Sequence, residues 1–172
     1  MGSRSEEVHL DELDWRLLAE LQADARLSYA QLGRRVNLSP PAVAERVRRL
    51  ERDGVITGYE AKVSAGRVGQ PVSMFVQLRC QLGSCLLKTS AADDYPEVVE
   101  VHKLTGEHCT MLKVRAASLE HLEGLLERLG KHGAMSTSMV LSTQYEGRRV
   151  EPAPSDYPRA TDSQGWRHTG SA

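Results

Sequence analysis

Apolar residues in the first third of the chain recur with the 3.6-residue period of amphipathic helices. A leucine stripe on residues 11–23 predicts the first helix, and two shorter stretches with the same period predict helices over residues 29–36 and 40–52. The leucines of the first stripe are Leu13, Leu17, Leu18 and Leu21. The last two helices are separated by only three residues, so the pattern predicts two short helices joined by a tight turn.

End signals delimit the second and third of these helices. Ser28 is a good N-cap, and Gln31 three positions later completes a capping box. Asn37 suits the left-handed conformation that ends many helices. Ser39 caps the next helix, and Pro40 takes the first helical position, where its missing N–H costs nothing. Together these signals predict a helix-turn-helix.

Positive charge is concentrated on this motif. From residue 26 to residue 52 seven arginines accompany two glutamates, a local excess of +5, whereas the whole chain carries −1. A helix-turn-helix lays the N-terminal part of its second helix in the major groove while flanking cations hold phosphates. We therefore predict that the chain binds double-stranded DNA. The alternative is that the arginines are the solvated face of an ordinary helical hairpin.

The expected DNA contacts divide by their place on the motif. Base contacts are predicted near residues 39–45, and backbone contacts from the arginines that follow, although Arg46 has the alternative of an ion pair with the first helix. The predicted DNA-binding residues are Ser28, Tyr29, Ser39, Pro40, Pro41, Ala42, Ala44, Glu45, Arg46, Arg48 and Arg49.

Beyond residue 71 the apolar period changes from 3.6 to 2, which is typical of half-buried strands. We expect strands over residues 72–82, 97–104, 110–116 and 135–145. A short, weakly patterned helix is expected within residues 83–95, and Ser118 caps a second helix. The leucines expected to be buried on that helix are Leu119, Leu122, Leu125, Leu126 and Leu129. The order strand–helix–strand–strand–helix–strand predicts a ferredoxin-like fold.

The pattern divides the chain into two domains of an α+β protein. Residues 55–63 look like short strand material that would make the motif a winged helix-turn-helix, and the glycines and proline that follow indicate a linker. The predicted segments are a disordered arm over 1–9, a DNA-binding domain over 10–63, a linker over 64–71, a ferredoxin-like domain over 72–150 and a disordered tail over 151–172.

No apolar run resembles a transmembrane span or a secretory signal, so we expect a cytoplasmic protein without membrane contact. The sequence also lacks a glycine-rich phosphate loop and the common hydrolase motifs, so we expect no enzyme activity and no cofactor. A regulatory subunit of an enzyme is the last of the alternatives.

Three cysteines and two nearby histidines suggest a second function, that of a thiol- or metal-responsive repressor. They are Cys80, Cys85, Cys109, His102 and His108. Their spacings are not those of zinc fingers, and adjacent residues 108 and 109 would point opposite ways in an extended chain. Cys80 also fits its strand as a small buried hydrophobe. We therefore expect no metal site, and keep the repressor as the alternative.

Over about residues 10–147 the chain resembles the Lrp/AsnC, or feast/famine, family of transcription regulators. The resemblance rests on L-D-E-L-D-W-R-L-L-A-E-L-Q-A-D-A-R-L-S, on N-L-S-P-P-A-V-A-E-R-V-R-R-L-E-R-D-G-V-I-T-G-Y and on P-E-V-V-E-V-H-K-L-T-G-E-H. It implies an N-terminal DNA-binding domain and a C-terminal ferredoxin-like effector domain. It also implies a dimer, often assembled further, with amino acids or related metabolites bound between effector domains.

The resemblance also implies where an effector binds. The implied residues are Thr105, Gly106, Glu107, His108, Cys109, Thr137 and Ser138. Many relatives carry an aspartate where this chain has Cys109, so the resemblance predicts weak binding of ordinary amino acids. From the residues alone, Gly106 permits a turn whose N–H groups can face a carboxylate. An effector-independent hairpin is the alternative.

Overall fold

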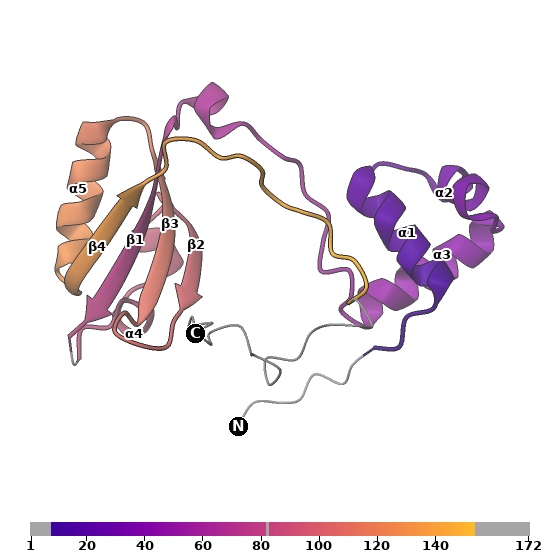
Figure 1. Ribbon diagram of the computed structural model, residues 1–172, viewed down its shortest axis with the longest axis horizontal. Helices are drawn as coiled ribbons and strands as arrows, with labels where there is room; N and C mark the ends of the chain where they lie inside the picture. Colours follow the sequence, from indigo (N-terminus) through magenta and orange to yellow (C-terminus); the bar gives the residue numbers. More distant parts are fainter. Residues whose placement is uncertain (1–7, 82, 154–172) are drawn as a thin grey trace, which may run out of the picture. The chain divides into compact units, whose positions relative to one another are not determined.

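The computed structural model describes residues 8–81 and 83–153. The chain forms two compact units, of which one comprises Met1–Glu60 with Gly147–Ala172 and the other comprises Ala61–Glu146 (Figure 1). Most of the predicted arm over 1–9 and tail over 151–172 lies outside the described residues. No helix among the described residues is long and apolar enough to cross a membrane.

The boundaries of the second unit differ from the predicted ones. Residues 64–71, predicted as a linker, belong to this unit and include a 3₁₀ turn over Ala65–Val68. At the other end, residues 147–150 belong to the first unit, because the backbone N–H and C=O of Val150 both hydrogen-bond to the Gln22 side chain.

The described part of the first unit contains three helices, and their ends confirm the predicted caps. They are α1 over Glu12–Ala23, α2 over Tyr29–Val36 and α3 over Pro40–Arg52. Ser28 and Gln31 form the capping box of α2, and Ser39 accepts a hydrogen bond from the N–H of Ala42 at the start of α3. The core that joins the helices consists of Leu17, Leu32, Val36, Val43 and Val47.

The backbone of the turn between α2 and α3 lies in close contact with α2 at Gly33. Asn37 is left-handed with φ 58°, as predicted, and the N–H of Leu38 returns to the carbonyl of Gly33 at 2.9 Å. A Cβ at Gly33 would lie 2.4 Å from the Leu38 carbonyl oxygen. This position therefore accepts only glycine without a shift of the backbone.

The strand expected over residues 55–63 is wrong. The structure assigns no strand there, and the N–H groups of Val55 and Ile56 both bond to the carbonyl of Leu50 in the last turn of α3. The chain thus folds back on the helix end instead of pairing with a strand. The described part of the first unit is a helix-turn-helix without a β wing.

The second unit is a four-stranded antiparallel sheet in the order β2-β3-β1-β4. Its elements are β1 over Val72–Cys80, α4 over Leu86–Thr89, β2 over Val98–Lys103, β3 over Thr110–Ala116, α5 over Leu119–Gly130 and β4 over Gly133–Met139. This order confirms the ferredoxin-like prediction. The last strand is shorter than predicted, since β4 ends at Met139 and Leu141 beyond it is 92% exposed.

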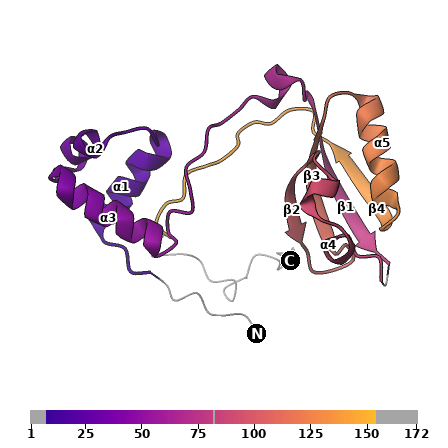
Figure 2. The same cartoon turned by 180° about the vertical axis from the view of Figure 1, so that it is seen from behind.

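Both helices pack on one face of this sheet (Figure 2). Leu86 of α4 and three leucines of α5 share a core with the β1 and β3 residues Val76 and Leu112. Leu119, predicted to be buried, is instead 58% exposed at the first position of α5. The strand residues that alternate with the core residues face the other way. On β1 and β3 they are Ser73, Phe75, Gln77, Met111, Lys113 and Arg115.

Candidate DNA-binding and effector sites

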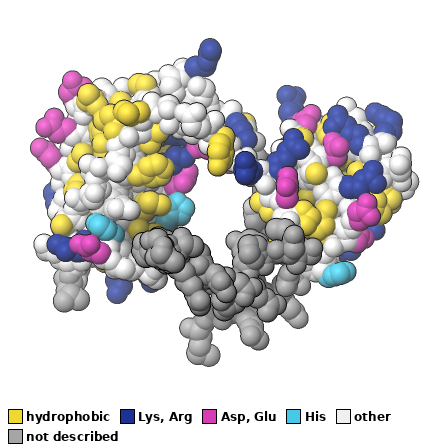
Figure 3. Space-filling view, viewed as in Figure 1, with side chains coloured by type: hydrophobic (Ala, Val, Ile, Leu, Met, Phe, Trp, Pro, Cys, Tyr) yellow, Lys and Arg dark blue, Asp and Glu magenta, His cyan; other side chains and the backbone are white. Residues whose placement is uncertain are grey.

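The first turns of α3 are free to meet another molecule. Ser39, Pro40 and Pro41 are exposed, Ala42 and Ala44 are half-buried, and Val43, Val47 and Leu50 anchor the opposite side. Cationic side chains lie among acidic ones on the helical unit (Figure 3). The predicted contact residues Ser28, Tyr29, Glu45 and Arg48 are also exposed. The apolar stripe thus fixes the helix from behind and leaves its N-terminal half available for a DNA groove.

A buried carboxylate of α1 accepts hydrogen bonds from two arginines of α3. Asp14 of α1 is 1% exposed and accepts hydrogen bonds from Arg46, at 2.8 Å, and from Arg49. Arg46 also donates to Asp11 at 2.6 Å. The hydrogen bond from Arg46 holds the pKa of Asp11 below its ordinary value. A charge buried this far needs such partners, because an isolated carboxylate is strongly disfavoured away from water.

This network gives two of the arginines a carboxylate partner on α1. Arg46 forms an ion pair with Asp14 of the first helix, which was the alternative predicted for it. Arg49 also forms an ion pair with Asp14. Each of the two side chains therefore has part of its donors engaged with Asp14 and remains partly exposed, at 26% for Arg46 and 37% for Arg49. Cations without a carboxylate partner have all their donors available to phosphates. Among the described arginines of the motif these are Arg26, Arg34 and Arg48, all exposed.

Sequence reasoning missed Asp14 as a site residue. An acid at this position is expected only to favour the start of α1, yet Asp14 lies three and four positions before Leu17 and Leu18 on the buried stripe. An acid on an apolar stripe, facing a helix rich in arginine, was the signal that could have found it. Gly33 offered no comparable signal, because its close contact with Leu38 appears only in three dimensions.

The predicted effector residues 105–109 form the turn between β2 and β3. Gly106 has φ 105°, a conformation that favours glycine. The N–H of Cys109 donates to the Leu78 carbonyl at 2.9 Å and so is not available to a ligand. Within the described chain the N–H groups of residues 105–108 have no protein acceptor. Glu107 pairs with Arg79 at 3.3 Å on the surface.

Thr137 and Ser138 do not face the same side of the sheet. In the register of β4 with β1, Thr137 stands beside the buried Val76 and Ser138 beside Phe75. Thr137 therefore lies on the helix-covered side and Ser138 on the open side, since neighbouring strand residues alternate. The two hydroxyls cannot both be presented by one subunit to a ligand on the open face.

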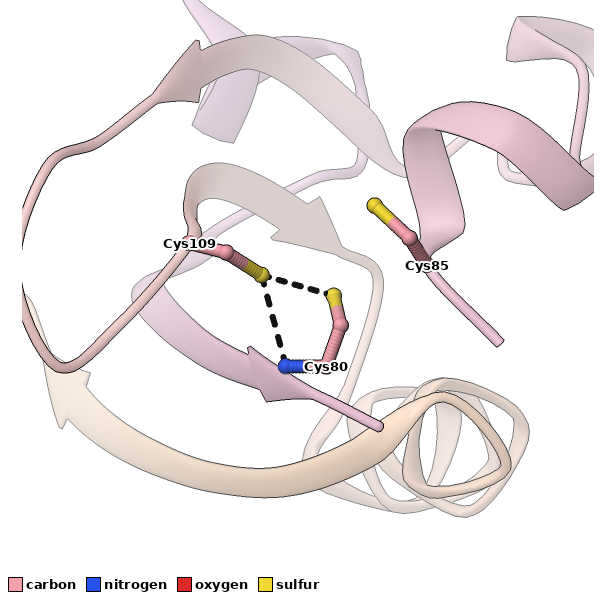
Figure 4. A group of neighbouring side chains, drawn as sticks. All are labelled: Cys80, Cys85 and Cys109. Carbon is pink, nitrogen blue, oxygen red and sulfur yellow. Dashed lines mark hydrogen bonds between the residues drawn. The ribbon is translucent and has the colours of Figure 1, made fainter. Parts of the chain in front are cut away.

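The three cysteines lie together, which their spacing did not predict. Their sulfur atoms are all within 4.8 Å of one another, and the sulfurs of Cys80 and Cys109 are 2.8 Å apart (Figure 4). Within the described residues neither His102 nor His108 joins this group.

The surroundings of Cys80 and Cys109 shift the pKa values of these two thiols in opposite directions. Burial, together with hydrogen bonding to Cys109, raises the pKa of Cys80 to about 11. Burial also acts to raise the pKa of Cys109, but hydrogen bonds from Cys80 and from the Thr110 hydroxyl outweigh it and lower that pKa to about 7. The two sulfurs are hydrogen-bonded to each other, so the side chain of Cys109 is engaged with Cys80.

Both units match models of known protein families. Residues 10–51 match the AsnC-type helix-turn-helix domain, and residues 73–150 match the Lrp/AsnC ligand-binding domain. The regulator LrpC of Bacillus subtilis is 35% identical over 135 residues, which is 78% of this chain and 94% of LrpC. The regulator LrpA of Mycobacterium tuberculosis is 37% identical over 152 residues, covering 83% and 97%.

Solved structures agree with these matches. The structure of B. subtilis LrpC superposes with a TM-score of 0.74 at 34% identity, over 79% of this chain and 97% of that one. The regulator NMB0573 of Neisseria meningitidis, solved as a complex with L-Met, gives a TM-score of 0.74 at 25% identity, covering 83% and 96%. The chain therefore belongs to the Lrp/AsnC family of DNA-binding transcriptional regulators.

Proposed function

We propose that this regulator reads a sequence-specific site in double-stranded DNA through the first turns of α3, and that a small carboxylate metabolite modulates its assembly or its DNA affinity. The observation that carries the first part is the division of α3 into a buried stripe and an exposed N-terminal half. Contacts to base edges would come from residues 39–45, and the exposed Arg48 and Arg34 would hold phosphates.

We infer that the protein acts as a dimer joined through the second unit. Both helices cover one face of the sheet, and the other face carries Phe75 and Met111 without a covering element in the described chain. A second copy placed on this face would shield both residues. A two-fold dimer would then bind a roughly palindromic site with half-sites one or more helical turns apart.

The proposed effector site lies on the turn between β2 and β3 and extends across the dimer interface. The unpaired N–H groups of residues 105–108 suit a carboxylate, and Ser138 on the open face would add a hydroxyl donor from that interface. A relative has been solved with L-Met, which supports an amino acid or a close analogue as the class of ligand. The Cys109 thiol is engaged with Cys80 and offers no carboxylate to an α-ammonium group.

Calorimetry against a panel of amino acids and the matching 2-oxo acids tests this site. We expect a 2-oxo acid to bind more tightly than the corresponding amino acid, because a 2-oxo acid has no ammonium group to pair. Gly106→Val should abolish binding, since a branched residue is strained at φ 105°. Ser138→Ala should weaken binding, whereas Thr137→Val on the covered side should not. Tight binding of an unmodified amino acid would refute the argument from Cys109, and binding that survives Gly106→Val would refute the site.

A further inference from the structure

Three different segments of the second unit bring all three cysteines of the chain to one point. Cys80 ends β1, Cys85 is the N-cap of α4, and Cys109 closes the turn before β3. Figure 4 shows the three side chains directed toward one another. The chain has no cysteine elsewhere.

We propose that Cys80, Cys85 and Cys109 form a binding site for a single thiophilic metal ion, with Zn²⁺ and Cu⁺ as the ions that such a site would take. The three sulfurs lie within 4.8 Å of one another. A zinc–sulfur bond is about 2.3 Å, so sulfurs that share one ion stand roughly 3.8–4.0 Å apart. The upper limit of these distances is thus close to the spacing in a loaded site, and the Cys80–Cys109 pair, at 2.8 Å, must open.

The donor set selects the class of ion. No histidine or carboxylate joins the three sulfurs within the described residues, so the site offers thiols alone. Soft thiolate ligands favour copper(I) and zinc, whereas calcium and magnesium require oxygen donors. An iron–sulfur cluster is held by four cysteines, one more than this chain supplies. Zn²⁺ would complete its tetrahedron with water, and Cu⁺ would accept three sulfurs in a plane.

The backbone around the cysteines is held in place before any ion binds. The N–H of Cys109 donates to Leu78 and its carbonyl accepts from Leu104, both at 2.9 Å. The carbonyl of Cys85 accepts the N–H groups of Lys88 and Thr89 as α4 begins. Because the main chain is fixed at these points, loading would need side-chain rotation rather than refolding. The ion would then join β1, α4 and the β2–β3 turn, and each thiol that ligates it would lose its proton to solvent.

Equilibrium dialysis of the full chain against Zn²⁺, and anaerobic titration with Cu⁺, test the proposal. The protein is first reduced with a phosphine and stripped with a chelator. We expect one ion per chain, and Cd²⁺ used as an optical probe should give thiolate-to-metal charge-transfer absorption. Removing even an outer-shell partner of a metal site weakens affinity about 10–100-fold, so each of Cys80→Ser, Cys85→Ser and Cys109→Ser should weaken binding by more than about tenfold.

His108→Ala is the matched control, because His108 adjoins Cys109 in sequence but lies outside the sulfur cluster. This variant should keep the ion, and the circular dichroism of all four variants should match that of the original chain. The proposal is overturned if the reduced protein takes up neither Zn²⁺ nor Cu⁺ at micromolar concentration. It is equally overturned if full affinity survives any one of the three serine substitutions.

Discussion

Asp14 is buried on α1, and its two carboxylate oxygens are shared between Arg46 and Arg49 of α3. The arrangement fixes α3 against α1 just beyond the recognition residues. Together with Asp11, which also pairs with Arg46, Asp14 offsets two of the positive charges that the sequence places on the motif. The charge left for DNA is therefore smaller and more localised than the sequence excess suggests.

Asp14→Asn should lower the free energy of unfolding by about 2–3 kcal/mol. This loss of stability is smaller than the loss expected for a fully buried ion pair, because the Arg46 and Arg49 side chains are 26% and 37% exposed. Urea titration followed by circular dichroism measures it. Glu20→Gln is the control, since it breaks only the exposed Glu20–Arg35 pair and should cost less than about 1 kcal/mol. Equal losses in both variants would show that Asp14 has no special role.

Among single residues, sequence reasoning predicts those whose role is local. Ser28, Asn37 and Ser39 act within four positions of their own place in the chain, and the structure confirms all three. The pairing of Arg49 with Asp14 was not predicted, because its partner lies 35 residues away on α1 and no local pattern reports such a contact.

At the scale of secondary-structure elements, Gly33 sets how closely α2 approaches the turn that leads to α3. A Cβ there would lie 2.4 Å from the Leu38 carbonyl oxygen, which belongs to the backbone and cannot rotate away. Gly33→Ala should therefore force the two helices apart and lower stability by about 1–3 kcal/mol, with a matching loss of DNA affinity. Thermal unfolding and a DNA titration of the same preparation check both effects.

Gly124→Ala is the control for this substitution. Gly124 lies in α5 and is exposed, and a Cβ added there would have no neighbour within 4 Å, so alanine should raise stability by about 0.5–1 kcal/mol. A neutral Gly33→Ala would mean that the turn adapts freely, contrary to the geometry described above.

Elements were predictable where their signals are internal to them. The three helices of the first unit follow the caps and apolar stripes, whereas residues 55–63 alternate like a strand but have no strand to pair with in the described chain. The predicted end of β4 is wrong for a related reason, since alternation continues past Met139 although pairing with β1 stops there. A strand needs a partner, and single-sequence alternation cannot supply one.

At the scale of the molecule, the open face of the sheet is the proposed basis of assembly. Phe75→Glu should place a charge at the centre of the proposed dimer interface and shift the protein toward monomer in light scattering. Leu119→Glu is the matched control, because Leu119 is 58% exposed on α5 away from this face. It should leave the mass unchanged. A monomeric original chain at micromolar concentration, or a Phe75→Glu variant that remains fully dimeric, would contradict the proposed interface.

The cysteine cluster shows what whole-molecule topology adds to a sequence. Sequence spacing argued against a metal site, because the spacings of the cysteines and histidines are not those of zinc fingers. Cys80 and Cys109 are 29 residues apart in the chain. They meet because β1 and β3 are neighbours in the order β2-β3-β1-β4, and Cys85 arrives where α4 begins. The fold class was predictable from the order of elements, but this juxtaposition depends on how strand ends align.

The central claim is that α3 lies in the major groove with Arg48 on phosphate while Arg46 and Arg49 hold α1. The most direct test is the slope of log affinity against log salt concentration, measured by fluorescence anisotropy on a duplex selected from random sequences. Arg48→Ala should reduce the magnitude of this slope by about one for each phosphate that the variant no longer neutralises, and Arg49→Ala, where folded, should leave it unchanged. An unchanged slope in Arg48→Ala, or a slope reduced only in Arg49→Ala, would contradict the account.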